Sequence, residues 1–300
     1  MKTFSIISKR SLWLSISGVM VVVGLVALGI WQLKLGIDFT GGSLLEVAYS
    51  SQAPSLENLT ATFSSLDIHD PEIKPSGERG IIVRFKTIDE PTHQKLIAEL
   101  KKTDSALVER SFDSIGPVIG AELKQKSIFA IVLALLMILL YIAFVFRKVS
   151  HPIASWKYGT SAILAVFHDL VFLLGIFALL GTFGGVEINS SFIPAFLTVL
   201  GFSVHDTIVV FDRIRENLTK FRGSFDEIVN KSLNETIVRS INTSFTVLLV
   251  LLAIFLFGGE TIKTFALALF LGIAVGTYSS IFVASPLLVV WNDWDARRKG

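Results

Sequence analysis

The sequence predicts a polytopic α-helical membrane protein with six transmembrane helices and one α+β domain between the first and second helices. Of its 300 residues, 52% are hydrophobic and 17% are charged, and a mean hydropathy of +0.65 exceeds what the surface of a single water-soluble globule carries. Six apolar stretches are each long enough to cross a hydrocarbon core of about 30 Å, which takes about 20 helical residues. All five tryptophans lie at or just beyond the ends of these stretches, where the indole ring prefers the headgroup level.

The predicted spans run over Leu12–Leu33, Ser127–Phe146, Thr160–Thr182, Ser191–Phe211, Ser240–Gly258 and Phe265–Trp291. The chain accordingly divides into a tail at 1–11, the first helix at 12–33, an exterior domain with its linkers at 34–126, helices 2 to 6 at 127–291, and a tail at 292–300. Basic residues precede the first span as in a secretory signal peptide, but its apolar run exceeds the roughly 7 to 15 residues of a cleavable core. We therefore expect the first span to be retained as an anchor.

The basic residues predict the orientation. They gather in the amino-terminal tail, in the loop with Arg147, Lys148 and Lys157, in the loop between the fourth and fifth spans, and in the tail after Trp294. The alternate short connections, 183–190 and 259–264, hold a single basic residue, Lys263. Because short basic loops stay on the cytoplasmic side, we expect a multi-pass protein of the cytoplasmic membrane with both termini in the cytoplasm and residues 34–126 outside.

The exterior segment has the pattern of one folded domain. Leu45, Val47 and Tyr49 alternate as in a half-buried strand, and a helical pattern follows over 56–66. A weak strand near Ile73, a glycine turn, an alternating strand at 81–85, a helix opened by Pro91 and a last strand at 106–112 complete the order βαββαβ. This order predicts a ferredoxin-like fold. Its two histidines lack ligand spacing, so a binding or lever role is the better prediction than catalysis.

Composition excludes several classes of function. The 27 basic and 25 acidic residues nearly balance, which leaves no excess for a nucleic-acid partner. The chain has no cysteine, so no disulfide, thiolate nucleophile, zinc ribbon or iron–sulfur cluster is expected. We expect a protein that is not an enzyme and needs no cofactor, whose chemistry rests on carboxylates, histidines and arginines.

Two spans carry ionisable groups, and both carry the same dipeptide: His168-Asp169 in the third and His205-Asp206 in the fourth. An ionised Asp at mid-helix costs about 2.5 to 3.5 kcal/mol on a translocon scale, so such residues face a bundle interior or water. At 1.5 Å per residue, Asp169 and Asp206 lie ~14 Å and ~8 Å from the predicted cytoplasmic ends of their spans. Arg239, at the start of the fifth span, is long enough to reach inward to a carboxylate. Such a cluster can bind and release a proton.

Structural readings of these residues stay open. Asp206 could be protonated and bonded to helix backbone, and His168 could be a packing residue. A metal site is disfavoured, because adjacent residues point ~100° apart on a helix, unlike helix-borne ligands at i and i+4. The cluster at the inner boundary of the fourth span, which holds Asp212, Arg213, Arg215 and Glu216, fits a solvated set of salt bridges.

Small residues on the first and last spans predict close helix contacts. Gly272 and Gly276 form a GxxxG pattern, and Gly24 and Gly29 lie in the first span. We expect these faces to permit packing against a partner.

Two long motifs resemble one family. Residues 36–42 read GIDFTGG and residues 199–217 read VLGFSVHDTIVVFDRIREN. Together they are similar to the SecD/SecF family of protein-export membrane proteins, which belongs to the RND transporter superfamily. The resemblance extends to 116–120, 239–244, 257–259 and 276–280 and covers almost the whole chain. Within these motifs, the residues that carry the resemblance to the family are Gly36, Asp38, Gly41, Gly42, Asp212 and Arg213.

The resemblance implies an RND-type half-bundle of six helices that pairs with six similar helices of a SecD-like subunit. It implies a proton-responsive acid in the fourth span, here Asp206, and an important arginine at the start of the fifth, here Arg239. His205 stands where the family usually has Asn, and it adds either a second proton carrier or a hydrogen bond. No SecD-like half is fused to this chain, so SecD is expected as a separate polypeptide.

The function implied is that of an accessory subunit of Sec protein export. With SecD, it would use the proton-motive force to promote preprotein translocation, with the SecYEG translocon, unfolded preprotein, protons and membrane lipid as further partners. Two alternatives come from other classes: an RND-type exporter of small solutes or lipids, and a structural scaffold for neighbouring subunits. A scaffold would leave export unchanged when Asp206 is neutralised.

Overall fold

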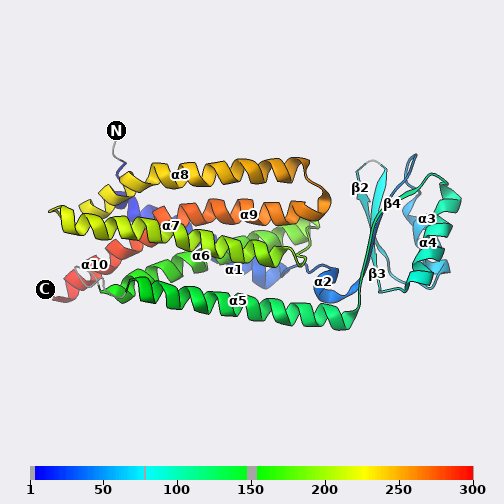
Figure 1. The fold of residues 1–300 in the computed structure, drawn as a ribbon, viewed down its shortest axis with the longest axis horizontal. Coiled ribbons are helices and arrows are strands. Elements are labelled where there is room, and N and C mark those ends of the chain that lie inside the picture. The colour runs from blue at the N-terminus through cyan, green and yellow to red at the C-terminus, as the bar shows by residue number, and fades with distance from the viewer. Residues whose placement is uncertain (1–3, 78, 147–153, 300) are drawn as a thin grey trace. The chain divides into compact units, whose positions relative to one another are not determined.

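The structure, a computed structural model, describes residues 4–77, 79–146 and 154–299 (Figure 1). The chain forms two compact units: Met1–Lys34 with Phe129–Gly300, called the membrane unit, and Leu35–Ile128, called the exterior unit after its predicted location. Arg147 and Lys148, which contribute to the predicted orientation, lie outside the described residues.

Within the described residues, six helical segments are long and apolar enough to span a membrane. They are α1 (Arg10–Trp31), α5 (Pro117–Val145), α6 (Ser155–Gly184), α7 (Phe192–Lys220), α8 (Phe225–Phe257) and a last span that combines α9 (Glu260–Ser279), a π-helical turn η2 (Ser280–Ala284) and α10 (Ser285–Lys299). The prediction of six membrane helices is confirmed.

Several helices run further than their apolar stretches, chiefly at the end of the bundle that holds both described chain ends (Figure 1). α7 continues past Phe211 to Lys220, and α8 begins at Phe225, well before Ser240. Hydropathy cannot detect these polar extensions. Local capping explains the second one: Ser224 and Glu227 form a reciprocal capping box that fixes the start of α8.

The central helices of the membrane unit are α6, α7 and the last span. In each of these three spans, at least half of the most apolar 18-residue stretch is buried within the unit. In α1, α5 and α8 the buried share of that stretch is 17% or less. Glycine lets the helices approach closely: a Cβ on Gly272 would lie 2.2 Å from Val199 of α7, and one on Gly175 would lie 2.5 Å from the Cα of Gly24. The small faces of Gly24, Gly272 and Gly276 thus pack inside this chain, not on a partner as predicted, while Gly29 has no atom within 4 Å of its Cβ position.

The exterior unit has the predicted order βαββαβ. Its strands and helices are β1 (Gly42–Ala48), α3 (Leu56–Ser65), β2 (Glu72–Ser76), β3 (Gly80–Phe85), α4 (Glu90–Thr103) and β4 (Val108–Ile115), preceded by the short helix α2 (Ile37–Thr40). The antiparallel sheet has the strand order β2-β3-β1-β4, and α3 and α4 cover one face (Figure 1). Leu45, Val47, Phe63, Val83 and Leu96 form the centre of its core and are fully buried. The ferredoxin-like prediction is confirmed.

Candidate proton-coupling site

Asp169 is the centre of a hydrogen-bond network in the core of the membrane unit. Its side chain, on α6, is 1% exposed. Oδ2 accepts bonds from the hydroxyl groups of Ser203 on α7 (2.6 Å) and Ser279 on α9 (2.7 Å), and Oδ1 lies 2.9 Å from Nδ1 of His168. Three donors from three helices satisfy this carboxylate, which compensates for its burial and ties the helices together.

Asp206 lies one helical turn beyond Ser203 on α7 and has a different environment. It is 4% exposed, and its Oδ2 has no hydrogen-bond partner among the described residues. The side chain faces the hydroxyl of Thr277 on α9. That hydroxyl already contacts Ser244 of α8 at 2.5 Å and donates to the carbonyl of Ile273. A buried carboxyl with an open acceptor is expensive when ionised, so it favours protonation or an added donor.

The π-helical turn η2 borders this site. Ser280, its first residue, contacts the hydroxyl of Thr207 at 2.9 Å and the carbonyl of Ser203 at 3.4 Å. Ser285 donates to the carbonyl of Ser280, five residues earlier. Single π turns inside α-helices are frequent at functional sites. Ser279, directly before the turn, bonds to Asp169, and Ser280, the first residue of the turn, bonds to Thr207 beside Asp206.

The structure brings together His168 and Asp169, but His205 and Arg239 lie elsewhere. Both are exposed on the surface of the isolated chain. Within the described residues, the Arg239 side chain forms no ion pair, so the inward reach to Asp206 that the sequence suggested does not occur in this chain alone. Both side chains are available to a neighbouring subunit or to lipid headgroups.

Sequence reasoning missed the hydroxyl groups that complete the site: Ser203, Thr207, Ser244, Thr277, Ser279 and Ser280. All are buried. A signal for them existed, because all six lie inside the motif segments 199–217, 239–244 and 276–280. Their role depends on helix packing, which the sequence does not specify.

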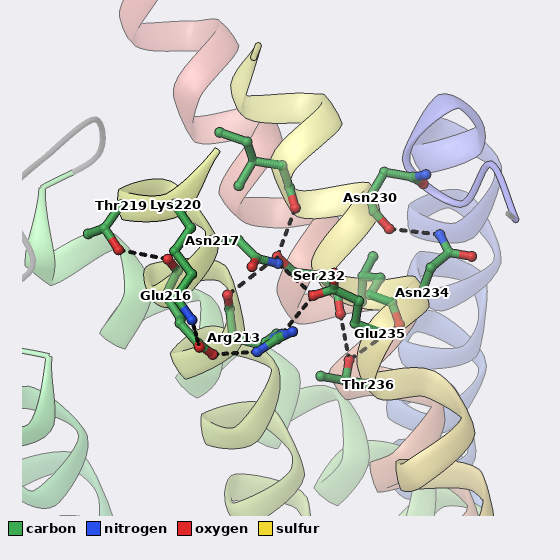
Figure 2. Close-up of polar contacts among 12 residues, drawn as sticks. Arg213, Glu216, Asn217, Thr219, Lys220, Asn230, Ser232, Asn234, Glu235 and Thr236 are labelled. Carbon is green, nitrogen blue, oxygen red and sulfur yellow. Dashed lines mark hydrogen bonds and ion pairs between the residues drawn. The ribbon is translucent and has the colours of Figure 1, made fainter. Parts of the chain in front are cut away.

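The family-motif residue Arg213 joins the extensions of α7 and α8 (Figure 2). Its Nε lies 2.7 Å from Glu235, and its Nη1 lies 2.5 Å from Glu216, which also pairs with Lys220. Asn217 donates to Ser232 (2.9 Å) and to Glu235 (2.8 Å) across the same seam. Of these contacts, the Arg213–Glu216 pair belongs to the boundary cluster that the sequence suggested, and those with Glu235 and Lys220 are additional. Asp212 is exposed, and its one ion-pair contact among the described residues is a 4.0 Å approach to Arg215.

The glycine motif fixes the start of the exterior unit. Gly36 precedes α2, whose first turn holds Asp38. Gly41 has φ +73°, and a Cβ there would lie 2.8 Å from the Cα of Pro117. A Cβ on Gly120 would lie 2.9 Å from the backbone nitrogen of Gly41, so glycine at 120 leaves room for the backbone of this motif.

Gly42 is constrained by a different neighbour, the strand β3. Its φ is +126°, and a Cβ would lie 2.9 Å from the carbonyl of Phe85. The motif therefore packs the start of β1 against the first turn of α5, and we call this contact the glycine clasp (Gly41, Gly42, Pro117 and Gly120). No other residue type fits at Gly41 and Gly42 without strain.

Among the described residues, no three His, Asp or Glu side chains gather as metal ligands would.

Fold and site together define a class: a polytopic membrane protein with carboxylates in its helix core and one ferredoxin-like domain between its first two spans. Comparison with known proteins gives the family. Residues 95–294 match the family model of the SecD/SecF protein export membrane protein, C-terminal region, and residues 26–53 match that of the SecD/SecF GG motif. The chain belongs to the SecD/SecF family.

Relatives named protein translocase subunit SecF match nearly end to end. The one from Thermobaculum terrenum is 46% identical over 296 residues, covering 94% of this chain and 92% of the relative. The one from Anaerolinea thermophila is 40% identical, covering 98% and 96%.

Among solved structures, SecDF from Thermus thermophilus, a translocon-associated membrane protein, superposes with a TM-score of 0.83 at 32% identity. The match covers 97% of this chain and 39% of that one. SecDF in its super-membrane-facing form gives 0.69 at 31% identity, with 100% and 40% covered. This chain therefore spans about two fifths of the SecDF chains.

Proposed function

We propose that this chain is the SecF subunit of the Sec protein-export machinery and that, with a SecD-like subunit, it uses the proton-motive force to promote preprotein translocation. The single observation that carries the coupling is Asp206: a carboxyl that is 4% exposed and has one oxygen without a partner among the described residues. The names of the relatives support the export role.

Proton binding at Asp206 supplies the switch. Uptake of a proton neutralises a buried charge, and release restores it, so the two states prefer different surroundings. One charge that crosses 100 mV releases about 2.3 kcal/mol, which shifts a two-state equilibrium by about fiftyfold. The protein acts as a proton-driven transport component and not as an enzyme.

A SecD-like partner completes the site. The matched SecDF chains are more than twice as long as this one, which leaves room there for a second half. Arg239 and His205 are exposed in this chain alone, and His205 directly precedes the buried Asp206 on α7. In the heterodimer, the partner covers them and brings Arg239 into contact with a carboxylate.

The proposal also includes the orientation of the protein in the membrane. Arg10 of α1 forms ion pairs with Asp226 of α8 (3.1 Å) and Asp293 of α10 (2.8 Å), so both described chain ends and the α7–α8 turn share one end of the membrane unit. We assign this end to the cytoplasm in a multi-pass protein of the cytoplasmic membrane. Because the chain has no native cysteine, Ser224→Cys tests the assignment. An impermeant thiol reagent is expected to label it only from the cytoplasmic side, and labelling only from outside would reverse the topology.

The exterior unit argues against a lipid exporter. It holds an open hollow of about 790 Å³, whose lining includes Asp70, Glu72, Arg84 and Lys86. Charged walls disfavour an apolar cargo. The scaffold alternative makes a different prediction, which the experiment below decides.

The test is preprotein translocation in vesicles that contain the SecD-like subunit, with and without an imposed proton gradient. Asp206→Asn keeps the size of the side chain and removes its charge, so we expect normal insertion and complete loss of the gradient-dependent increment. Arg239→Met is expected to act similarly, whereas Asp67→Asn on the exterior unit is the matched silent control. If Asp206→Asn retains the increment at equal protein level, the scaffold role replaces proton coupling.

A further inference from the structure

The chain leaves the membrane unit through a strained residue at the end of α1. Gln32, which ends this helix, has φ +55° and ψ −178°, close to a backbone region that is almost confined to glycine. Other residue types keep such a conformation only where the surrounding structure enforces it. Two residues later the chain reaches Lys34, the last residue of the membrane unit before the exterior unit begins. Contacts around 32–34 must therefore hold this path.

Those contacts come from the end of α6 and from the α6–α7 loop (185–191). The carbonyl of Lys34 accepts a bond from the backbone nitrogen of Ile188 (2.8 Å), and the Lys34 ammonium lies 3.5 Å from the carboxylate of Glu187. Ile188 is 3% exposed, so the residue that holds the Lys34 backbone is itself anchored in the unit. The rings of Trp31 and Phe183 also meet, with centroids 5.6 Å apart. The exit of α1 is thus fastened to α6 and to the loop that follows it.

The end of α6 leaves space for this segment. A Cβ on Gly181 would lie 3.0 Å from the Cβ of Lys34, so glycine provides the room that Lys34 occupies. Gly185 ends the helix with φ +65°, and the nitrogen of Val186 bonds back to the carbonyl of Leu180 (3.1 Å). This type of helix end fixes the direction in which the loop departs.

The next residue of the chain is already fixed in the exterior unit. The carbonyl of Leu35 accepts a bond from Nη1 of Arg84 on β3 (3.4 Å), and Nη2 of the same guanidinium bonds to Thr40 (2.6 Å). Lys34 and Leu35 are consecutive residues. Little chain is therefore left between the two anchors to absorb a displacement of Lys34.

The second connection between the units, α5, is attached differently. Within 129–145, the described part of α5 that belongs to the membrane unit, Ile142 is the one buried residue, and it lies near the end of α5 that is farthest along the chain from the exterior unit. The α1 connection instead meets α6 at Gly181, which lies 12 residues, or about 18 Å, beyond Asp169 on the same helix. The α6–α7 loop leads directly into α7, which carries Asp206.

We propose that residues 32–34, the end of α6 and the α6–α7 loop form a fixed joint, through which a displacement of α6 and α7 reaches the exterior unit. Gly181, Glu187 and Ile188 are positioning residues in this joint, because they act on the exterior unit through Lys34. The inference rests on the proposed function for the origin of the displacement, which is proton exchange at Asp206. If these contacts only closed the end of α6, loosening the chain beyond Lys34 would have no effect on export.

A Gly-Ser-Gly insertion between Lys34 and Leu35 tests the joint in the complete chain with its SecD-like subunit. The insertion leaves the residues that contact Lys34 unchanged but separates the two anchors by flexible chain. We expect the gradient-dependent export increment to fall by about fivefold or more, while translocation without a gradient is unchanged. The matched control carries the same insertion after Ser51, in the exposed loop between β1 and α3, and is expected to keep the increment. Thermal unfolding and co-purification with the SecD-like subunit verify that both variants fold and assemble.

A point variant displaces the joint without lengthening the chain. Gly181→Val brings a side chain against Lys34, so we expect the gradient-dependent increment to fall by about half. Gly184→Val, one turn later on α6, is the control and is expected to leave the increment intact, because the nearest atom to a Cβ there is 3.8 Å away. Equal increments in the two variants would contradict the joint.

A cross-link provides the converse test, because the chain has no native cysteine. A short bifunctional thiol reagent that joins Lys34→Cys to Glu187→Cys is expected to leave the increment intact, since a fixed joint stays closed throughout the cycle. Loss of the increment on cross-linking, restored by a reductant, would show that the joint opens and would overturn the inference.

Asp206→Asn separates this inference from the proposed function. If the insertion after Lys34 keeps the increment while Asp206→Asn abolishes it, the joint is overturned and the proposed function stands. If the insertion abolishes the increment while Asp206→Asn keeps it, the joint is supported and Asp206 is not the coupling acid.

Discussion

Two carboxylates lie in the core of the membrane unit, each directly after a histidine, and their surroundings differ. Asp169 has three donors within 2.9 Å, and its histidine is buried beside it. Asp206 keeps an unpartnered oxygen, and its histidine is exposed. The same dipeptide in neighbouring spans therefore has two different environments. This difference is what the proposed function expects, with Asp169 holding helices together through its bonds and Asp206 exchanging a proton.

The largest expected effect separates these roles by stability. Asp169→Ala removes the acceptor that Ser203 and Ser279 share, and it leaves buried hydroxyl groups without partners, so we expect a loss of about 3 kcal/mol. Thermal unfolding in detergent measures the change. Asp206→Asn, by comparison, is expected to alter stability by less than about 1 kcal/mol, because no bond to Oδ2 is lost. Equal losses in the two variants would contradict the comparison.

A somewhat smaller effect is expected where helix spacing supports the Asp169 network. Gly272→Ala places a methyl group 2.2 Å from Val199, which forces α9 away from α7. We expect a loss of about 1 to 3 kcal/mol by thermal unfolding, as for other overpacked cores. Gly29→Ala, which meets no atom within 4 Å, is the control and is expected to be neutral. If Gly272→Ala is as stable as the unchanged protein, α7 and α9 can move apart without loss of stability.

Two serine variants refine the comparison further. Ser203→Ala removes a bond to a carboxylate, expected to be worth about 1.5 to 3 kcal/mol, whereas Ser244→Ala removes a bond between neutral hydroxyl groups, worth about 0.5 to 1.5 kcal/mol. Chemical unfolding of the two variants under identical conditions checks the order. The reverse order would mean that Asp169 is not ionised in the resting protein.

The sequence predicted the architecture better than the site. Apolar length is sufficient to locate the membrane helices, and period-two alternation is sufficient for strands such as β1, because both signals are local. The partners of Asp169 are not local: Ser203 is 34 residues away and Ser279 is 110 residues away. The contacts of Arg239 are not local either: its depth can be judged from the sequence, whereas the direction of its side chain depends on the rotation of α8, and in this chain alone it is exposed.

The smallest expected effect concerns an unpartnered oxygen outside the membrane. The Tyr49 hydroxyl of the exterior unit is buried without a partner among the described residues, and burial, with a smaller contribution from Asp104, raises its pKa to about 12. Because the folded state favours the neutral phenol, this contribution to stability is complete below pH 10 and is lost as the pH rises toward 12.

Tyr49→Phe is therefore expected to change the free energy of unfolding by less than about 1 kcal/mol at neutral pH. It is also expected to reduce the loss of stability that occurs as the pH rises from 10 to 12. Unfolding followed at a series of pH values tests both statements, and export is expected to be unaffected. A loss of export in Tyr49→Phe would show that an unpartnered oxygen marks function outside the bundle as well.

The glycine clasp has a mechanical consequence. β1 and β4 are antiparallel neighbours, and the first residue of β1, Gly42, pairs with the last residue of β4, Ile115. Tension between the two chain connections of the domain would therefore break the hydrogen bonds of this strand pair one after another, starting at Gly42 and Ile115. The clasp holds Gly41 against Pro117 just beyond the first rung. A domain loaded through both of its connections thus resists peeling at the point where peeling would begin.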